Sequence, residues 1–278
     1  MAKLFITGAN EYVGRFLIEK ALLKEHSVTL IHTQALLGLG DVSTHVRDTA
    51  QAQDYIELLQ GHDLIIHLDP RFAAMTGIIA AAKQTGITRI LFLSRLGARP
   101  QSPVASFACY HESEKLLRDS GLQWSIFKPS LIYGPGEPRL SHLVKWLENS
   151  PLIPYVNGWG MLQPVDVYDL VEFMLGAATN PETAGHNFEI GGTERVSMGQ
   201  LIDLFLDLMG KHRLKWPWFT TYAQWLSRRF SKLPFPLWGT LEDVLMHNEQ
   251  LICNMRGLPY QFKIQLSPLR EGLKKYYL

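Results

Sequence analysis

The first half of the chain alternates short apolar runs with longer amphipathic stretches. The apolar runs have the length of strands, and the predicted strands span residues 3–6, 27–31, 63–67, 89–94 and 124–127. The predicted helices between them span residues 14–24, 54–59, 72–84 and 107–119. Near-continuous apolar strands joined by helices are typical of parallel sheets that are buried on both faces. We therefore predict an α/β fold with a doubly wound parallel sheet.

After Pro129 the alternation loosens, because Pro and Gly interrupt shorter elements. Residues 164–175 still resemble a strand followed by a helix, and residues 187–191 resemble a strand. Ser197 is a suitable cap for a helix over residues 198–209, with Gly210 as its stop. We predict a main domain mainly within residues 1–160. A smaller, interleaved C-terminal lobe on the substrate side lies mainly within residues 161–278, and some of its elements return to the main core.

Composition and charge narrow the class of protein. Hydrophobic residues make up 46% of the 278 residues and charged residues 19%, which is typical of a globular protein. The 27 basic and 26 acidic side chains leave a net charge of +1, so we predict no nucleic-acid partner. No stretch approaches the ~20 apolar residues that span a bilayer, and the first residues lack the apolar region of a signal peptide. We predict a cytoplasmic protein without a transmembrane segment, with peripheral membrane contact left open.

The spacing of the cysteine and histidine residues indicates neither a metal site nor thiol chemistry. Cys109 and Cys253 are the two cysteines, and they show no paired spacing. The ten histidines follow no zinc-binding pattern. We predict neither a metal site nor a disulfide.

A glycine-containing turn over residues 7–14 follows the first predicted strand and leads into the first predicted helix. This context is typical of a dinucleotide-binding turn, in which glycines allow close packing and the helix N-terminus receives the diphosphate. We therefore predict a Rossmann domain that binds NAD or NADP. The predicted cofactor-binding residues of the turn are Thr7, Gly8, Asn10, Glu11, Tyr12, Val13 and Gly14. The alternative is a structural turn that has lost its ligand.

Two positions make this site atypical. Glu11 stands where a glycine would let the backbone approach the diphosphate, and its carboxylate either lies near the phosphates, points to solvent or caps the helix. The second predicted strand leads into His32, Thr33 and Gln34, so neither the acidic residue that favours NAD nor the arginine that favours NADP is present. Asp48 is a predicted adenine contact or, alternatively, a helix cap.

Several segments together resemble the short-chain dehydrogenase/reductase superfamily along nearly the whole chain. They are the turn, the strand over 63–67, and the segments 124–136, 164–170, 188–192 and 269–276. The chain is most similar to the atypical, extended-type branch of NAD-dependent epimerase/dehydratase-like proteins, near the nucleotide-binding accessory subunit of respiratory complex I. Active members of the superfamily use a Tyr, a Lys four residues later, and a Ser or Thr at the end of the preceding strand.

The resemblance places Ser106 at the Tyr position and Tyr110 at the Lys position, so the catalytic pair is missing. Ser94, at the end of a strand, and Tyr110 are the candidate catalytic residues. Alternatively, Ser94 only ends the strand and Tyr110 is a buried or pocket-lining aromatic residue. A pair formed by Tyr110 and Lys115 would need about 100° of helix rotation.

The resemblance extends the cofactor site to two further strand ends. Pro129 and Ser130 follow the strand that passes the nicotinamide in this family, and residues 133–136 resemble the loop after it. His67, Leu68 and Asp69 occupy the place where the fourth strand meets the cofactor. Asp69 and His111 form an alternative acid-base pair if the fold brings them together.

Residues 211–238 are richer in aromatic and basic side chains than their surroundings. One interpretation is a surface for a protein partner or a membrane. The other is a lobe that packs its aromatic residues over the substrate cleft, because three prolines prevent a long amphipathic helix.

Our first hypothesis for function is an NAD(P)-binding accessory or sensor protein with weakened or lost Tyr/Lys catalysis. The alternative is an NAD(P)H-dependent reductase or a sugar-nucleotide epimerase with a non-standard active site. A third hypothesis is an interaction module that no longer holds a nucleotide. The sequence leaves the enzymatic activity, the substrate and the oligomeric state open.

Overall fold

The computed structural model describes residues 2–9, 11–32, 42–46, 51–229 and 241–278. Its first half alternates strands and helices as predicted, and the ends of each predicted element lie within two residues of the observed ones. These elements are β1 (Lys3–Thr7), α1 (Gly14–Leu23), β2 (Ser27–His32), β3 (Ser43–Val46), α2 (Gln53–Leu59), β4 (Leu64–His67), α3 (Phe72–Thr85), β5 (Arg89–Leu93), α4 (Ala105–Arg118) and β6 (Gln123–Pro129).

The main sheet contains seven described strands in the order β11-β6-β5-β4-β1-β2-β3, and β11 (His186–Ile190) is its edge strand. All of its described pairings are parallel. β1 pairs with β2 on one side and with β4 on the other, so the direction of winding reverses there. Ligands of doubly wound sheets bind at the carboxyl ends of the strands beside such a reversal. The predicted doubly wound Rossmann sheet is confirmed.

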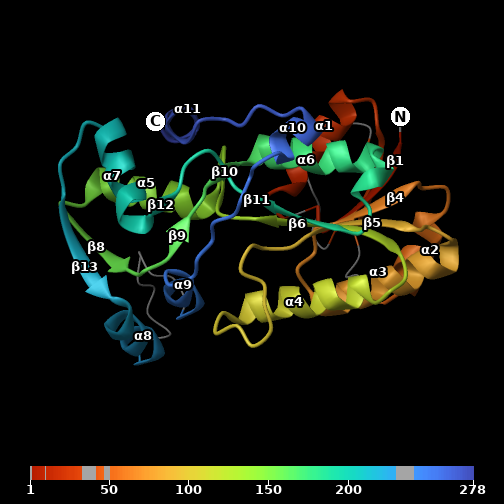
Figure 1. Cartoon of the computed structure of the whole chain (residues 1–278), viewed down its shortest axis with the longest axis horizontal. Coiled ribbons are helices and arrows are strands. Elements are labelled where there is room, and N and C mark those ends of the chain that lie inside the picture. The colour runs from red at the N-terminus through yellow and green to blue at the C-terminus, as the bar shows by residue number, and fades with distance from the viewer. Residues whose placement is uncertain (1, 10, 33–41, 47–50, 230–240) are drawn as a thin grey trace.

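Helices cover both faces of the sheet because its strands are apolar on both faces (Figure 1). Leu4 and Ile6 of β1 belong to the core shared with α1 and with α6 (Val167–Thr179). Phe5, between them, belongs to the core shared with α2 and α3. This two-sided burial is the reason why the strands read as continuous apolar runs instead of alternating ones.

The second half builds a smaller lobe, at the left of Figure 1, and returns to the main sheet in several places. Helix α6 packs on α1, β11 pairs with β6, and α10 (Leu258–Phe262) packs on α6 and β11 through Phe262, which contacts Phe173 and Phe188. The remaining elements are β7 (Ile132–Tyr133), α5 (Pro138–Asn149), β8 (Leu152–Asn157), β9 (Met161–Leu162), β10 (Val165–Asp166), the 3-10 helix η1 (Pro181–Thr183), β12 (Val196–Ser197), α7 (Met198–Leu208), β13 (Leu214–Phe219), α8 (Thr220–Arg229), α9 (Leu241–Met246) and α11 (Leu269–Tyr277).

The lobe has its own apolar core between α5, α7 and α11. Leu147, Phe205 and Leu273 are fully buried there. Helix α7 begins as predicted, because the hydroxyl of Ser197 accepts from the Gln200 amide while the Gln200 side chain accepts from the Ser197 amide. Gly210, with φ of 63°, follows the end of the helix.

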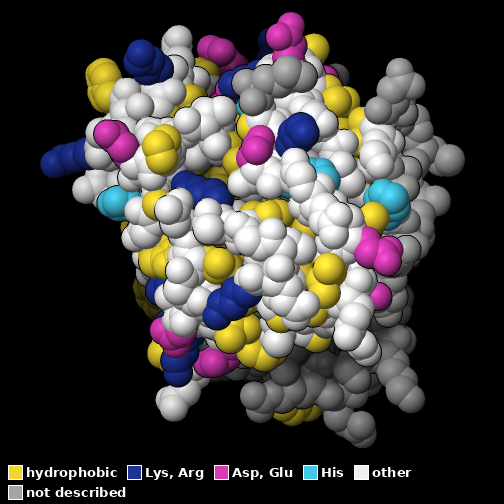
Figure 2. Space-filling model, turned by 90° about the vertical axis from the view of Figure 1, so that its right-hand side faces the viewer, with side chains coloured by type: hydrophobic (Ala, Val, Ile, Leu, Met, Phe, Trp, Pro, Cys, Tyr) yellow, Lys and Arg dark blue, Asp and Glu magenta, His cyan; other side chains and the backbone are white. Residues whose placement is uncertain are grey.

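Figure 2 views the molecule from the end opposite the lobe, where basic and acidic side chains are dispersed among the apolar ones. In the part of the chain that the structure describes, no helix has the length and apolarity needed to cross a bilayer.

Candidate functional site

The turn between β1 and α1 needs its two glycines for steric reasons. Gly8 has φ of +69°, and a Cβ there would lie 2.6 Å from the amide nitrogen of Asp69, on the chain that leaves β4. A Cβ at Gly14 would lie 2.2 Å from the carbonyl oxygen of Ala9. Both distances are far below van der Waals contact. The turn is therefore packed tightly against itself and against β4, as a diphosphate cradle requires.

The N-terminus of α1 has no side-chain cap. Val13 occupies the cap position and is buried, and the first turn of the helix contains no acidic residue. Free amide groups at a helix N-terminus favour a bound anion. The cap alternative for Glu11 is thus wrong, since no side chain caps this helix and the Glu11 side chain is exposed. Asn10 lies outside the described residues.

Charged residues of both signs surround the turn. Although the Glu11 side chain is exposed, local desolvation and then the charge of Asp69 raise its pKa. Arg95 and Arg71 act in the opposite direction. The carboxylate is therefore easier to neutralise than an ordinary glutamate when a second negative group approaches.

The turn also contacts the loop that follows β7. The ring of Tyr12 packs edge-on against Phe16, and the guanidinium of Arg15 lies 4.4 Å from the centroid of the Phe16 ring. Arg15 donates to the carbonyl of Pro135. A Cβ at Gly134 would lie 2.7 Å from the Tyr12 hydroxyl. The structure thus joins the turn to the predicted nicotinamide-side loop.

Beneath the turn, the carboxyl end of β4 is closed by a buried polar pair. The Nδ1 atom of His67 lies 2.6 Å from Oγ1 of Thr7, and both side chains have no exposed surface. Burial lowers the pKa of His67 to about 4, so its ring is neutral near pH 7. Leu68 is buried in the core, and its amide donates to the Thr7 carbonyl. These three predicted residues support the turn from below.

Asp69 is bound by Arg71 instead of His111. Its carboxylate accepts from the Arg71 amide at 2.9 Å, from Nε at 3.0 Å and from a terminal guanidinium nitrogen at 2.7 Å. The predicted alternative acid-base pair of Asp69 and His111 is therefore wrong, because the carboxylate already has a charged partner.

The candidate catalytic Ser94 faces a buried acid. It follows β5 and is 1% exposed, and its hydroxyl donates to Glu114 of α4. Glu114, also 1% exposed, accepts from Arg118 at 2.7 Å and lies 3.1 Å from Nζ of Lys128. No local pattern indicates this cluster of Ser94, Glu114, Arg118 and Lys128, because a glutamate on an amphipathic helix ordinarily faces solvent.

The second candidate, Tyr110, lies one helical turn before Glu114 and packs beside Phe92. Burial raises the pKa of the Tyr110 hydroxyl, and a hydrogen bond with Arg95 opposes this rise. A tyrosine that acts as a general acid or base near pH 7 needs a lowered pKa. The environment of Tyr110 therefore shifts its pKa in the unfavourable direction. Ser106, at the predicted Tyr position, is half-buried on the same helix.

At the end of β6, Pro129 and Ser130 are both buried. The hydroxyl of Ser130 donates to the carbonyl of Leu251 at 2.6 Å and accepts from the amide of Gln163 at 3.0 Å. Ser130 thus connects two segments of the second half to the carboxyl end of the sheet.

Two residues were predicted to contact the adenosine side of the cofactor. His32 is the last residue of β2, and its side chain lies outside what the structure describes. Asp48 lies outside the described residues.

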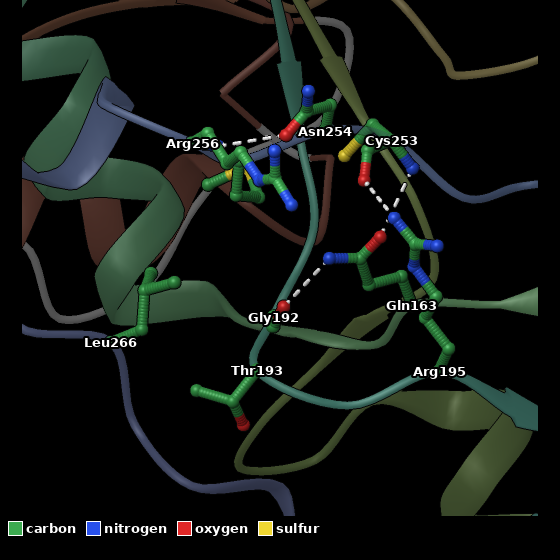
Figure 3. Close-up of a pocket in the computed structure, with 9 residues that line it drawn as sticks. Gln163, Gly192, Thr193, Arg195, Cys253, Asn254, Arg256 and Leu266 are labelled. Atoms are coloured by element: carbon green, nitrogen blue, oxygen red, sulfur yellow. Dashed lines mark hydrogen bonds between the residues drawn. The ribbon is translucent and has the colours of Figure 1, made fainter.

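A pocket of about 570 Å³ opens next to these segments, near the carboxyl end of β11 (Figure 3). The side-chain amide of Gln163 connects two of the lining segments. Its nitrogen donates to the Gly192 carbonyl at 2.8 Å, and its oxygen accepts from the Cys253 backbone amide at 3.0 Å. Arg195 donates to the Cys253 carbonyl at 2.9 Å. The lining residues are Gln163, Gly192, Thr193, Arg195, Cys253, Asn254, Met255, Arg256 and Leu266.

Two guanidinium groups, of Arg195 and Arg256, make this pocket suited to an anionic group. The pocket was not predicted from the sequence. The Gly191-Gly192 pair is the signal that could have indicated it, since a Cβ at Gly192 would lie 1.9 Å from the carbonyl oxygen of Pro164. Such a close approach shows that β11 ends against the segment before β10.

Comparison with known proteins agrees with this geometry. A family model described as NAD(P)H-binding matches residues 8–144, which include the turn and the ends of β4 and β5. Those residues form an NAD(P)H-binding domain. The predicted cofactor, NAD or NADP, is confirmed at this level, and the turn fits it because its glycines and its uncapped helix are those of a diphosphate site.

The family model and the curated relatives confirm the predicted resemblance to the atypical short-chain dehydrogenase/reductases. A mitochondrial NADH dehydrogenase [ubiquinone] 1 alpha subcomplex subunit 9 from Dictyostelium discoideum is 23% identical over 218 residues, covering 76% of this chain and 58% of that protein. This chain therefore spans little more than half the length of that relative.

Two solved structures share the fold. An NADPH-dependent quinone oxidoreductase from Escherichia coli, complexed with NADPH, superposes with a TM-score of 0.81 at 20% identity over 99% of this chain and 100% of that one. A nucleoside-diphosphate-sugar epimerase from Staphylococcus aureus gives a TM-score of 0.81 at 17% identity over 98% and 99% of the two chains.

Proposed function

We propose that this protein holds NAD(P) as an accessory or sensor subunit and has weakened or lost Tyr/Lys redox catalysis. The observation that carries the proposal is that α4 has other residues at the two catalytic positions. Ser106 and Tyr110 stand at the Tyr and Lys positions, and the hydroxyl of Ser94 is bound by Glu114. Bound NAD(P) supplies hydride transfer, which needs a proton donor or acceptor beside the substrate.

The cofactor-binding assignments remain part of this proposal. Residues 7–14 would hold the diphosphate through backbone amides, with His32 and Asp48 on the adenosine side. Asp69, Pro129 and Ser130 would flank the nicotinamide side, because the carboxyl ends of parallel strands share one edge of the sheet. His67 and Leu68 would act by supporting the turn, since their side chains are buried.

Calorimetry with NADH and NADPH, followed by turnover assays with quinone and sugar-nucleotide substrates, tests the proposal. We expect binding of at least one cofactor, and turnover that is absent or unchanged by Tyr110→Phe. Tyr110→Phe is a suitable probe because it removes only the hydroxyl. Turnover that falls with Tyr110→Phe while cofactor binding is unchanged would favour an enzyme. Absence of binding at millimolar cofactor contradicts the proposal.

The pocket supports a second candidate, a reductase or epimerase with a non-standard active site. Its two arginines and its place near the carboxyl end of β11 suit a substrate that carries an anionic group. A double change of Arg195 and Arg256 to Gln tests this candidate. Loss of turnover without loss of NAD(P)H binding supports it, and unchanged turnover excludes these arginines from the reaction.

We also propose the division into a Rossmann domain mainly within residues 1–160 and a lobe mainly within residues 161–278. The packing of α5 and β8 with the lobe, and of α6 and β11 with the main sheet, suits an interleaved boundary.

A cytoplasmic location with peripheral membrane contact is part of the same proposal, and cell fractionation tests it. A partner protein would be recognised by stable co-purification.

A further inference from the structure

Large apolar side chains are exposed together at the far end of the lobe. Six of them expose more than half of their surface: Trp159 88%, Leu214 71%, Trp216 53%, Phe219 75%, Tyr222 66% and Trp225 60%. We call these six residues the aromatic surface. The interpretation in which the aromatic residues of 211–238 pack over the substrate cleft is wrong for Trp216, Phe219 and Trp225. Isolated exposed apolar residues are ordinary, but a group of this size marks a contact surface.

The six residues come from connected pieces of backbone. β13 contributes three of them and continues directly into α8, which contributes two. β13 pairs with β8, where Phe219 is opposite Asn157, and Trp159 follows Asn157 by two residues. Figure 1 shows β13 and α8 at the end of the molecule away from the main sheet. The six residues therefore lie along one edge of the lobe, with Leu214 and Trp216 on one face of β13 and Phe219 on the other.

The backbone below the aromatic surface is anchored. Trp218 is half-buried and packs with a small core of Val156, Ala223 and Val244. The hydroxyl of Thr220 lies 3.1 Å from the side-chain oxygen of Asn248. Nζ of Lys215 lies 2.6 Å from a carboxylate oxygen of Asp203. The rings are thus presented by a fixed strand and helix.

The charges in this part of the chain have one sign. Between Asp207 and Glu242 there is no acidic residue, although the whole chain has nearly equal numbers of acids and bases. The basic residues in that interval are Lys211, Arg213, Lys215, Arg228, Arg229 and Lys232. Lys211 and Arg213 donate to the backbone carbonyl of Glu148 at 3.2 and 3.1 Å. This acceptor is neutral, so the contact does not balance their positive charges. The aromatic surface therefore lies within a basic segment.

We propose that the aromatic surface docks on an anionic lipid bilayer. Tryptophan and tyrosine favour the headgroup region, and lysine and arginine are attracted to anionic lipids. Trp216, Tyr222 and Trp225 supply the first kind, and Lys211 and Arg213, just before β13, supply the second. Aromatic residues and arginine are also enriched at protein interfaces, but lysine, which occurs three times between Asp207 and Glu242, is depleted there, and this favours the bilayer. Docking places the main sheet, at the opposite end of the molecule, away from the membrane.

Flotation of the full chain with vesicles tests the proposal. Vesicles of phosphatidylcholine are compared with vesicles that also contain phosphatidylglycerol, at low and at high salt. We expect binding to the anionic vesicles, weakened by salt because screening reduces the attraction of the basic residues. The triple variant Trp216→Ser, Phe219→Ser, Trp225→Ser is expected to bind about tenfold more weakly.

The matched control is the double variant Leu23→Ser, Tyr260→Ser, which removes two exposed apolar side chains elsewhere, 70% and 89% exposed. It is expected to bind vesicles like the unchanged chain. Calorimetry with NAD(P)H and thermal unfolding check that the triple variant keeps its fold, and they test the proposed cofactor function separately. Equal binding by the triple variant, equal loss in the control, or dimerisation through this surface without vesicle binding overturns the proposal.

Discussion

The turn after β1 and helix α4 approach the same edge of the sheet, and they suit the proposed cofactor site and the proposed catalytic site to different degrees. In the turn, both glycines are sterically required and the helix N-terminus is uncapped, as dinucleotide binding demands. On α4, a buried carboxylate holds Ser94 and burial raises the pKa of Tyr110. Holding a cofactor needs backbone shape, whereas catalysis needs particular side chains with shifted pKa values, so the second property is lost more easily.

The largest expected effect concerns the Glu114 cluster. Glu114→Gln removes the buried charge that partners Lys128 and Arg118, and we expect the free energy of unfolding to fall by about 3–5 kcal/mol. Urea unfolding measures it, with Glu112→Gln, exposed on the same helix, as the control. If Glu114→Gln is as stable as the control, the buried cluster does not stabilise the fold.

The buried His67 below the turn predicts a loss of stability in acid. Its folded pKa of about 4 lies below the ordinary value of 6.5, so the unfolded chain binds the proton more readily. Stability is therefore complete above about pH 6.5 and is lost as the pH falls toward 4, by about 3 kcal/mol from this group. His67→Asn should remove that part of the pH dependence, whereas His186→Asn, at an exposed position, should not. If the free energy of unfolding depends on pH in the same way for the unchanged chain and for His67→Asn, the prediction is wrong.

Adding a methyl group at Gly14 tests whether the turn binds the cofactor. Gly14→Ala should weaken NAD(P)H binding about tenfold and lower the free energy of unfolding by about 1–3 kcal/mol, because the methyl group overlaps the Ala9 carbonyl. Gly86→Ala is the control, since Gly86 has φ of +79° but open space around its Cβ position. It should lose stability without losing affinity in calorimetry. Unchanged affinity in Gly14→Ala would show that the cofactor binds elsewhere.

The smallest expected effect concerns Glu11. Glu11→Gln removes a negative charge beside the predicted diphosphate site, and we expect affinity for NADPH to rise by a few-fold at low salt and less at high salt. Glu25→Gln, exposed beyond the end of α1, provides the control. A fall in affinity would mean that the Glu11 carboxylate accepts a hydrogen bond from the cofactor.

Local patterns were enough to predict much of the fold. The apolar runs and their lengths located the predicted strands, because a strand buried on both faces needs apolar side chains at successive positions. The glycine positions and their place between a strand and a helix indicated the turn. The absence of a Tyr/Lys pair was also readable, since the spacing of four residues on one helix face is a local property.

Long-range contacts decided the rest. Glu114, Arg118 and Lys128 read as ordinary surface charges, and only the packing of α4 against β5 and β6 buries the carboxylate. The pairing of Asp69 with Arg71, in place of His111, depended on where each side chain points at the sheet edge. The pocket beside Gln163 is assembled from segments about 90 residues apart.

The sequence by itself determined the layered α/β fold, the dinucleotide turn and the missing catalytic pair, because each depends on residue type at short, regular spacing. Only the tertiary structure decided which polar groups are buried together, where the pocket lies, and that the aromatic residues of β13 and α8 face outward. Burial is a property of what packs against a residue, and no local pattern contains the packing partner.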